Sequence, residues 1–282
     1  MGCTERKSGT TLLVAFEGWN DACQSATNVV RSLVAHYDSR EVRHIACDGY
    51  YDYQSARPMM CHVTGRARII WPRTTFFEIA LDDGYRVFAQ LAPEPNYRWV
   101  EYCRESLSIA QELDVDHVVT MGGMLAECPH TRPLPLDVSD SDRRCDMDRE
   151  YNGPVGITTV FDQMAREDGF DASSMWVSVP QYLDCDECAQ GTLQLTRRLS
   201  RLLGHDIDVS ELVGQANLWR AQVDRTTSGD SDLADYVRRL EREYDARRGS
   251  CGPCGREFDA QSESSADELV RDVENYLRGL DS

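Results

Sequence analysis

An apolar run, a polar turn and an amphipathic segment follow one another at the start of the chain and constrain its fold more than any other feature. Residues 11–16 form a short apolar run that predicts a buried strand. Residues 17–21 (EGWND) are a turn, and the apolar side chains after it fall on one helical face. These are Ala22, Ala26, Val29, Val30, Leu33 and Val34. A strand, a turn and a helix in this order predict an α/β fold with a parallel sheet and crossover helices.

The same alternation continues to about residue 205. Apolar runs predict further strands at residues 42–46, 117–121, 155–160 and 174–179, with helices between them. Residues 66–92 contain two extended segments around the sequence Asp-Asp-Gly, which is typical of a hairpin turn. We expect this hairpin to be an insertion in the α/β core, and its exposed surface to be a candidate contact between subunits.

From about residue 206 only helical periodicity remains. Apolar stripes at helical spacing run through residues 209–219, 233–244 and 269–277. We therefore expect an α/β core at residues 1–205 and a helical, lid-like subdomain at residues 206–282.

Composition argues against several classes of function. The 282-residue chain has a formal net charge of −18, and so acidic a surface repels nucleic-acid phosphates. No apolar run approaches the roughly 20 residues of a membrane span, and no signal peptide precedes the first strand. We therefore expect a cytoplasmic protein that contacts neither nucleic acid nor membrane. Lys7 is the single lysine, which argues against a Walker phosphate loop and Schiff-base chemistry.

The first candidate site is the turn after residues 11–16, because ligands of open α/β sheets bind beyond the carboxyl ends of the strands. Glu17 would contact a ligand there, and the N-terminus of the next helix would bind an anion. The alternative is that Asn20 or Asp21 is a helix N-cap, with Gln24 completing a capping box.

The second candidate site follows the strand at residues 117–121, which is expected to end in Gly122 and Gly123. Paired glycines let a ligand approach backbone N–H groups closely. In the loop that follows, His130 would exchange a proton near neutral pH and Arg132 would hold a carboxylate or phosphate. The alternative is a turn-rich loop with exposed side chains.

The eleven cysteines are an odd number, and in a reducing compartment they argue against a disulfide scaffold. Cys185 with Cys188, and Cys251 with Cys254, have the spacing of zinc-ligand pairs. The second pair also matches a thioredoxin-type redox motif, although it lies between predicted helices. The two pairs are farther apart than in usual zinc sites. The favoured interpretation is reduced loop thiols, and we expect neither a metal nor a cofactor.

Several segments together resemble the PAC2 family, which contains proteasome assembly chaperones, and most of all its actinobacterial branch. The matching stretches are residues 12–22 (LLVAFEGWNDA), 94–99 (EPNYRW), 122–135 (GGMLAECPHTRPLP), 151–156 (YNGPVG) and 179–182 (VPQY). The resemblance implies a three-layer α/β/α core similar to the nucleoside phosphorylase/hydrolase architecture. It also implies an oligomer, for example a trimer, assembled through a β-hairpin, and a helical lid over a ligand cleft.

The resemblance brings no established catalytic residues with it. Glu17, Asn20, His130, Thr131 and Arg132 lie in the matching stretches and are site candidates for that reason alone. The chain also departs from its relatives, which commonly have a small, glycine-like residue in place of Cys23 and a proline-rich stretch in place of residues 184–191.

Two hypotheses from different classes follow. In the first, the chain is a non-enzymatic, oligomeric assembly or scaffold protein, chaperone-like, with a protein client. In the second, it is an enzyme or sensor for a small anionic ligand, bound between the carboxyl edge of the sheet and the helical lid. Five residues would converge on that ligand. They are Glu17, Gly122, Gly123, His130 and Arg132.

Overall fold

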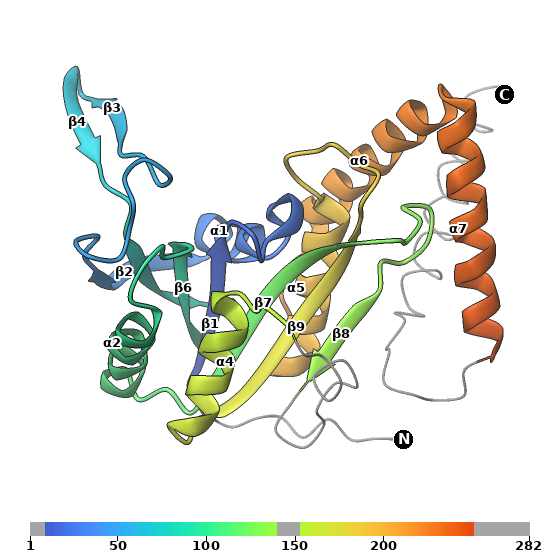
Figure 1. The fold of residues 1–282 in the computed structure, drawn as a ribbon. Coiled ribbons are helices and arrows are strands. Elements are labelled where there is room, and N and C mark those ends of the chain that lie inside the picture. The colour runs from blue at the N-terminus through green and yellow to red at the C-terminus, as the bar shows by residue number, and fades with distance from the viewer. Residues whose placement is uncertain (1–8, 140–152, 251–282) are drawn as a thin grey trace, which may run out of the picture.

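A seven-stranded sheet runs through the middle of the molecule (Figure 1). The structure is a computed structural model, and it describes residues 9–139 and 153–250. The strands of this sheet are β1 (Thr11–Glu17), β2 (Asp38–Ile45), β5 (Thr74–Ala80), β6 (Arg86–Pro93), β7 (His117–Ala126), β8 (Leu136–Ser139) and β9 (Asp171–Pro180). They lie in the order β2-β5-β6-β1-β7-β9-β8.

The four central strands, β6, β1, β7 and β9, are parallel, whereas the flanking pairs are antiparallel. The predicted α/β fold is thereby confirmed, with a mixed sheet that is parallel in its centre. Strand β1 lies between β6 and β7 and is buried from Thr11 to Phe16, as expected for an apolar run covered on both faces. The carboxyl ends of the central strands point to one edge, where Glu17 ends β1.

Helices cover both faces of the sheet (Figure 1). The helices are α1 (Thr27–His36), α2 (Trp99–Glu112), α4 (Ile157–Glu167), α5 (Ala189–Leu203), α6 (Ser210–Ser228) and α7 (Ser231–Ser250), with a short 3₁₀ turn η1 (Ala22–Gln24) before α1. Leu13 packs with α1 and α5 in one core cluster, and Leu12 packs with α2 and α4 in another. Adjacent residues of a strand point to opposite faces, so β1 feeds both cores.

A separate two-stranded sheet, β3 (Met59–Val63) and β4 (Arg66–Ile70), stands away from the body (Figure 1). The hairpin predicted at residues 66–92 does turn at Asp-Asp-Gly, but its place as an insertion is corrected here. Its Asp-Asp-Gly turn joins β5 to β6 inside the central sheet, and the projecting hairpin turns earlier, at Thr64-Gly65. Both turn residues have positive φ, 50° and 76°. Such a turn normally contains Asn or Asp with Gly, and a β-branched Thr gives no such signal.

Two further predictions are corrected. Strand β7 does not end at Gly122-Gly123 but continues through both glycines to Ala126. The predicted strand at residues 155–160 is instead the start of α4, whose buried residues Ile157, Phe161 and Ala165 recur at helical spacing. The β-branched residues of this segment favour a strand locally, but the period of its apolar face is helical.

Helices α6 and α7 correspond to two of the three predicted tail helices, and the third, at residues 269–277, lies outside the described residues. Buried Leu212 and Ala216 of α6 pack with Leu193 of α5, and α7 packs against α6. Within residues 9–139 and 153–250, none of the helices has the length and apolar character needed to cross a bilayer.

Candidate functional site

Two adjoining cavities lie at the edge of the sheet where the parallel strands end. The hairpin cleft, of about 830 Å³, lies between this edge and the β3–β4 hairpin. The sheet-edge cavity, of about 750 Å³, lies beyond β1 and along β7 and β9. Trp19 and Val155 line both cavities, and 72% of Trp19 is exposed. The edge of the sheet where the sequence predicts a ligand site therefore contains cavities.

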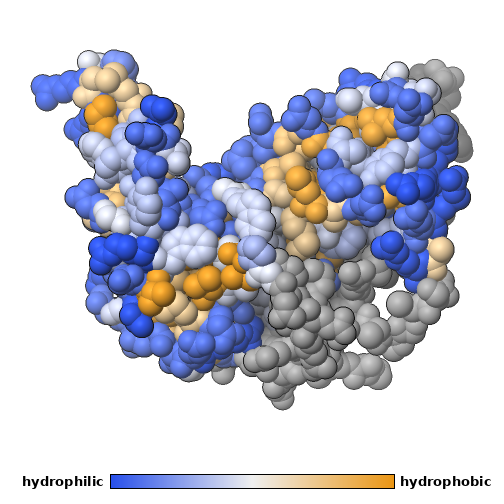
Figure 2. Space-filling view, viewed as in Figure 1, coloured by the Kyte–Doolittle hydropathy of each residue, from blue (hydrophilic) through white to orange (hydrophobic). Residues whose placement is uncertain are grey.

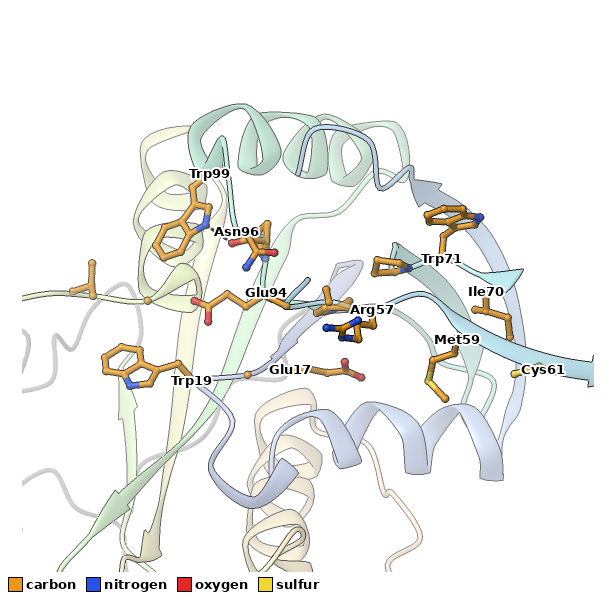
Figure 3. Close-up of a pocket in the computed structure, with 18 residues that line it drawn as sticks. Glu17, Trp19, Arg57, Met59, Cys61, Ile70, Trp71, Glu94, Asn96 and Trp99 are labelled. Carbon is orange, nitrogen blue, oxygen red and sulfur yellow. Dashed lines mark hydrogen bonds between the residues drawn. The ribbon is translucent and has the colours of Figure 1, made fainter. Parts of the chain in front are cut away.

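The hairpin cleft has apolar and aromatic walls with a few charges (Figure 3). Met59 and Ile70 come from the hairpin, and Trp99 comes from the start of α2. Glu17 lines the cleft, but its carboxylate forms an ion pair with Arg31 of α1. The negative charge of Glu17, the predicted ligand residue, is thus already paired with Arg31, and this ion pair connects β1 to the helix that follows it.

Asn20 is buried and joins several elements at the sheet edge. Its Nδ2 donates to Glu94 Oε1 at 3.2 Å, and its carbonyl oxygen accepts from the N–H of Gly123 at 2.8 Å. A Cβ on Gly156, the residue before α4, would lie 2.1 Å from Asn20 Nδ2. Asn20 therefore holds the turn after β1 against β7 and α4, and it also lines the sheet-edge cavity.

Asp21 satisfies the N-terminus of α1 from outside the helix. Its Oδ1 accepts from the N–H of Ala26 at 2.7 Å, and its Oδ2 accepts from the N–H of Thr27 at 3.3 Å. Burial raises the pKa of Asp21, and these hydrogen bonds oppose that rise. The expected capping box does not form, because the Gln24 side chain bonds Arg31 and the carbonyl oxygen of Asp186 instead.

The two glycines of β7 make room for neighbouring groups. A Cβ on Gly122 would meet the Trp176 ring at 2.6 Å, and one on Gly123 would meet the backbone of Ala22 at 3.1 Å. The N–H of Gly123 is bonded to Asn20, so this amide is not available to an anion. Close packing, not ligand approach, explains why these positions lack a side chain.

His130 is buried and both of its ring nitrogens are engaged. The hydroxyl oxygen of Tyr182 accepts from the N–H of His130 at 2.8 Å and lies 2.7 Å from its Nδ1, while Nε2 lies 2.9 Å from Asp224 Oδ1. A neutral ring satisfies all of these contacts, because the hydroxyl then donates to Nδ1 and Nε2–H donates to Asp224. Burial lowers the pKa of His130, although Asp224 opposes this.

Thr131 and Arg132 bind the tail helices. The Thr131 hydroxyl donates to Glu241 Oε1 at 2.5 Å, and Arg132 makes two 3.0 Å hydrogen bonds to the Asp245 carboxylate. On α6, Arg220 donates to the carbonyl oxygen of Thr131 at 2.6 Å. We call residues 130–132 the clamp loop, because each of them bonds α6 or α7.

The five residues expected around one anion thus lie at different sites. Glu17 lines the hairpin cleft and Gly123 lines the sheet-edge cavity, Gly122 packs on Trp176, and His130 and Arg132 hold the tail helices. They share an edge of the sheet because β1 and β7 are parallel neighbours. Their side chains are nevertheless directed to different partners, which a sequence pattern does not reveal.

Sequence reasoning missed a contact between two cysteines in the wall of the sheet-edge cavity. The Sγ atoms of Cys23 and Cys185 lie 3.5 Å apart. The available signal was the presence of Cys23 in place of a small residue. Within residues 9–139 and 153–250, no three His, Cys, Asp or Glu side chains are arranged to hold a metal ion. Cys251 and Cys254 lie outside the described residues, so the zinc alternative stays untested.

A family model described as the PAC2 family matches residues 15–227, well over half of the chain. The chain belongs to the PAC2 family. A Mycobacterium tuberculosis proteasome-assembly chaperone homologue is 33% identical, with a TM-score of 0.73 over 80% of this chain and 99% of its own. A PAC2 family protein from Streptomyces avermitilis is 32% identical, with a TM-score of 0.73 over 81% and 99%. The predicted likeness to actinobacterial PAC2 proteins is confirmed.

More distant solved structures share the fold alone. Pyrococcus furiosus PbaB, an archaeal proteasome activator, is 13% identical, with a TM-score of 0.59 over 79% of this chain and 96% of its own. A comparison with curated proteins gives no match. In this PAC2 protein the stretches that carry the family resemblance hold the sheet edge together through Asn20 and Gly123 and attach the tail helices through the clamp loop.

Proposed function

We propose that this PAC2 protein is a cytoplasmic assembly or scaffold protein that self-associates through its projecting hairpin. The observation that carries the proposal is the apolar surface of the hairpin arm, which we define as residues 57–73. Met59 pairs with Ile70, and Met60 pairs with Ile69. Because side chains alternate along a strand, the two pairs lie on opposite faces. Between 47% and 66% of each of these side chains is exposed.

The arm needs a partner on physical grounds. A two-stranded sheet with both faces in water is marginally stable. Figure 2 shows the arm standing clear of the body with hydrophobic residues on its surface. Each apolar Å² removed from water contributes about 25 cal/mol, so covering this arm stabilises both the arm and the complex. Apolar surface of this kind marks interaction sites in proteins.

The charge of the arm indicates which surface covers it. Residues 57–73 contain four arginines and no acidic residue, although the chain as a whole carries −18. Two arms repel each other, whereas an arm and the acidic body of a second copy attract. Contact between an arm and the body of the next copy is heterologous, and such contacts form a ring when the rotation between copies closes and a filament when it does not. A trimer is the ring we propose.

We also propose a three-layer core and a protein client for this chain. Helices on both faces of the sheet support a three-layer α/β/α core of the nucleoside phosphorylase/hydrolase type. The Mycobacterium relative and PbaB are both described by a relation to the proteasome, which supports a protein client for this chain.

The alternative, an enzyme or sensor for a small anionic ligand, has weaker support. Gly123, His130 and Arg132 are engaged in bonds within the chain. The sheet-edge cavity is lined by Asp21, Asp137 and Asp184, and carboxylates repel an anion. A thermal-shift screen with phosphate and small carboxylates tests this alternative, and we expect no stabilisation.

Native mass spectrometry of the purified chain at micromolar concentration tests the scaffold proposal. We expect a species of three times the 32.0 kDa chain mass, which falls toward monomer as salt screens the arginines of the arm. A 32.0 kDa species at every protein concentration and every ionic strength would overturn the proposal.

A further inference from the structure

Two cysteines that are 162 residues apart in sequence meet beside the sheet-edge cavity. Cys23 lies in η1, in the turn after β1, and Cys185 lies in the loop between β9 and α5. Their Sγ atoms are 3.5 Å apart, and both side chains are half-buried. A bond of about 2.05 Å between them requires the sulfurs to approach by about 1.5 Å. This contact is independent of the hairpin arm.

The two loops are already tied together by their backbones. The N–H of Cys188 donates to the carbonyl oxygen of Cys23 at 2.8 Å, and Gln24 Nε2 donates to the carbonyl oxygen of Asp186 at 3.3 Å. These bonds hold the Cys23 turn against the Cys185 loop. The sulfurs are therefore close because the loops are docked, and a small local movement is sufficient to join them.

The backbone of Cys23 is unusual for a residue with a Cβ. Its φ and ψ are 49° and 39°, and the next residue, Gln24, has a φ of 51°. Two consecutive non-glycine residues in the left-handed region are uncommon, and such conformations cluster at functional sites. Here the conformation belongs to the turn that presents the Cys23 thiol to Cys185.

Cys185 is the more reactive of the two thiols. The contact with the Cys23 thiol, and then the neighbouring indole of Trp219 of α6, lower the pKa of Cys185 to about 7, against the effects of burial and of Asp184 and Asp186. The same contact with Cys185, together with burial, raises the pKa of Cys23. The thiolate is the nucleophilic form, so Cys185 attacks and Cys23 is the second thiol.

Cys188 does not compete for this role, although its spacing from Cys185 resembles a redox motif. Its side chain is fully buried, and its Sγ accepts from the N–H of Gly191 at the start of α5, at 3.4 Å. Burial raises the pKa of Cys188 to about 12. A buried, protonated thiol that caps a helix is a poor nucleophile.

We propose that Cys185 and Cys23 form a redox pair that is oxidised by hydroperoxides. The Cys185 thiolate attacks the terminal oxygen of the hydroperoxide, the O–O bond breaks, and the leaving alkoxide or hydroxide takes a proton. Cys185 is thereby oxidised to a sulfenic acid. The sulfur of Cys23 then attacks the sulfur of Cys185, the S–O bond breaks, and the hydroxyl group leaves with the Cys23 proton as water.

The balance is two thiols and one hydroperoxide giving one disulfide, one alcohol or water, and one further water. The disulfide joins the turn after β1 to the loop after β9, and Cys185 loses its thiolate beside Trp219 of α6. A dithiol reductant restores both thiols by exchange. Oxidants and reductants around the protein therefore decide whether these two loops in the wall of the sheet-edge cavity are covalently joined.

The test is peroxide treatment of the purified full chain, followed by alkylation of free thiols and peptide mapping without reduction. We expect a linked pair of peptides containing Cys23 and Cys185 and a mass loss of two hydrogens, both reversed by dithiothreitol. At neutral pH a thiol of pKa about 7 is roughly half ionised, against about 3% for an ordinary thiol. Oxidation of Cys185 should therefore be on the order of tenfold faster than that of an ordinary half-buried thiol.

Two variants separate the steps. In Cys23→Ser the sulfenic acid of Cys185 should persist and be trapped by dimedone, and in Cys185→Ser the Cys23 thiol should stay reduced. Cys61→Ser, on the hairpin arm, is the matched control and should form the Cys23–Cys185 link as the wild type does. Full alkylation of both thiols after peroxide treatment, or a link from Cys185 to Cys188 instead, would overturn the proposal. Because the wild-type map is decisive alone, a variant that fails to fold does not obscure the result.

Discussion

The imidazole Nε2 of His130 lies 2.9 Å from Oδ1 of Asp224, which joins the loop after β7 to helix α6. The same ring is held on its other side by the hydroxyl of Tyr182, 2.7 Å from Nδ1. His130, which the sequence suggests as a proton-transfer residue, thus attaches helix α6 to the loop after β7. A neutral ring can accept from the hydroxyl at Nδ1 and donate to Asp224 from Nε2, whereas a protonated ring has no acceptor at Nδ1, so this attachment depends on pH.

His130 should make the protein less stable in mild acid. Burial lowers its pKa below the ordinary 6.5, so as pH falls through about 6.5 the unfolded chain takes up a proton before the folded chain does. The contribution of His130 is therefore complete above about pH 6.5 and is lost as pH falls through the folded pKa.

Thermal melts of wild type and His130→Gln at about pH 7.5 and about pH 5.5 measure this effect. The variant should lose about 1–2 kcal/mol at the higher pH through its missing buried hydrogen bonds, or roughly 2–6 °C in Tm. The difference between the two proteins should shrink at the lower pH, because the wild type loses its advantage there. A difference that is the same at both pH values would contradict a neutral, buried His130.

Arg132 should hold α7 locally rather than stabilise the whole fold. Its two bonds to Asp245 are partly exposed, and such pairs contribute about 0–1 kcal/mol. We expect Arg132→Ala to speed amide exchange in α7 up to roughly fivefold and to leave β7 unchanged. Arg238→Ala is the matched control, because Arg238 pairs with Asp235 inside α7 itself. Equal effects of the two substitutions on α7 exchange would count against the clamp.

Gly122 should not tolerate a side chain. A Cβ there would lie 2.6 Å from the Trp176 ring, and overpacking of this kind costs about 1–3 kcal/mol. Urea denaturation of Gly122→Ala should show that loss. Gly214 lies within α6 with nothing within 4 Å of an added Cβ, so Gly214→Ala should instead stabilise by about 0.5–1 kcal/mol. If both substitutions shift stability in the same direction, the packing explanation for Gly122 is wrong.

Elements with a strong, uninterrupted period were predictable from the sequence. The buried run of β1 and the apolar stripes of α6 and α7 each keep one hydrophobic period along their length. The Asp-Asp-Gly hairpin turn was predictable, whereas the projecting hairpin was missed. Its turn at Thr64-Gly65 lacks the usual residues, and the segment predicted as extended at residues 68–81 hides the break at Trp71-Pro72.

The location of the candidate site was predictable from the sequence, but the side chains available to a ligand there were not. Parallel strands bring Glu17 and Gly123 to one edge, and the cavities do lie there. Which groups are free depends on partners far away in sequence, such as Asp224 for His130 and Asp245 for Arg132. The contact between Cys23 and Cys185 depends in the same way on the docking of two loops.

The hairpin arm carries the central claim, and sedimentation velocity tests it most directly. Met60→Asp combined with Ile69→Asp places two charges on one apolar face of the arm, while Leu218→Asp alters an exposed leucine of α6 that is 73% accessible. The account predicts that the arm variant sediments as a 32.0 kDa monomer, while the wild type and the α6 variant sediment as the same larger species. An arm variant that sediments together with the wild type would contradict it.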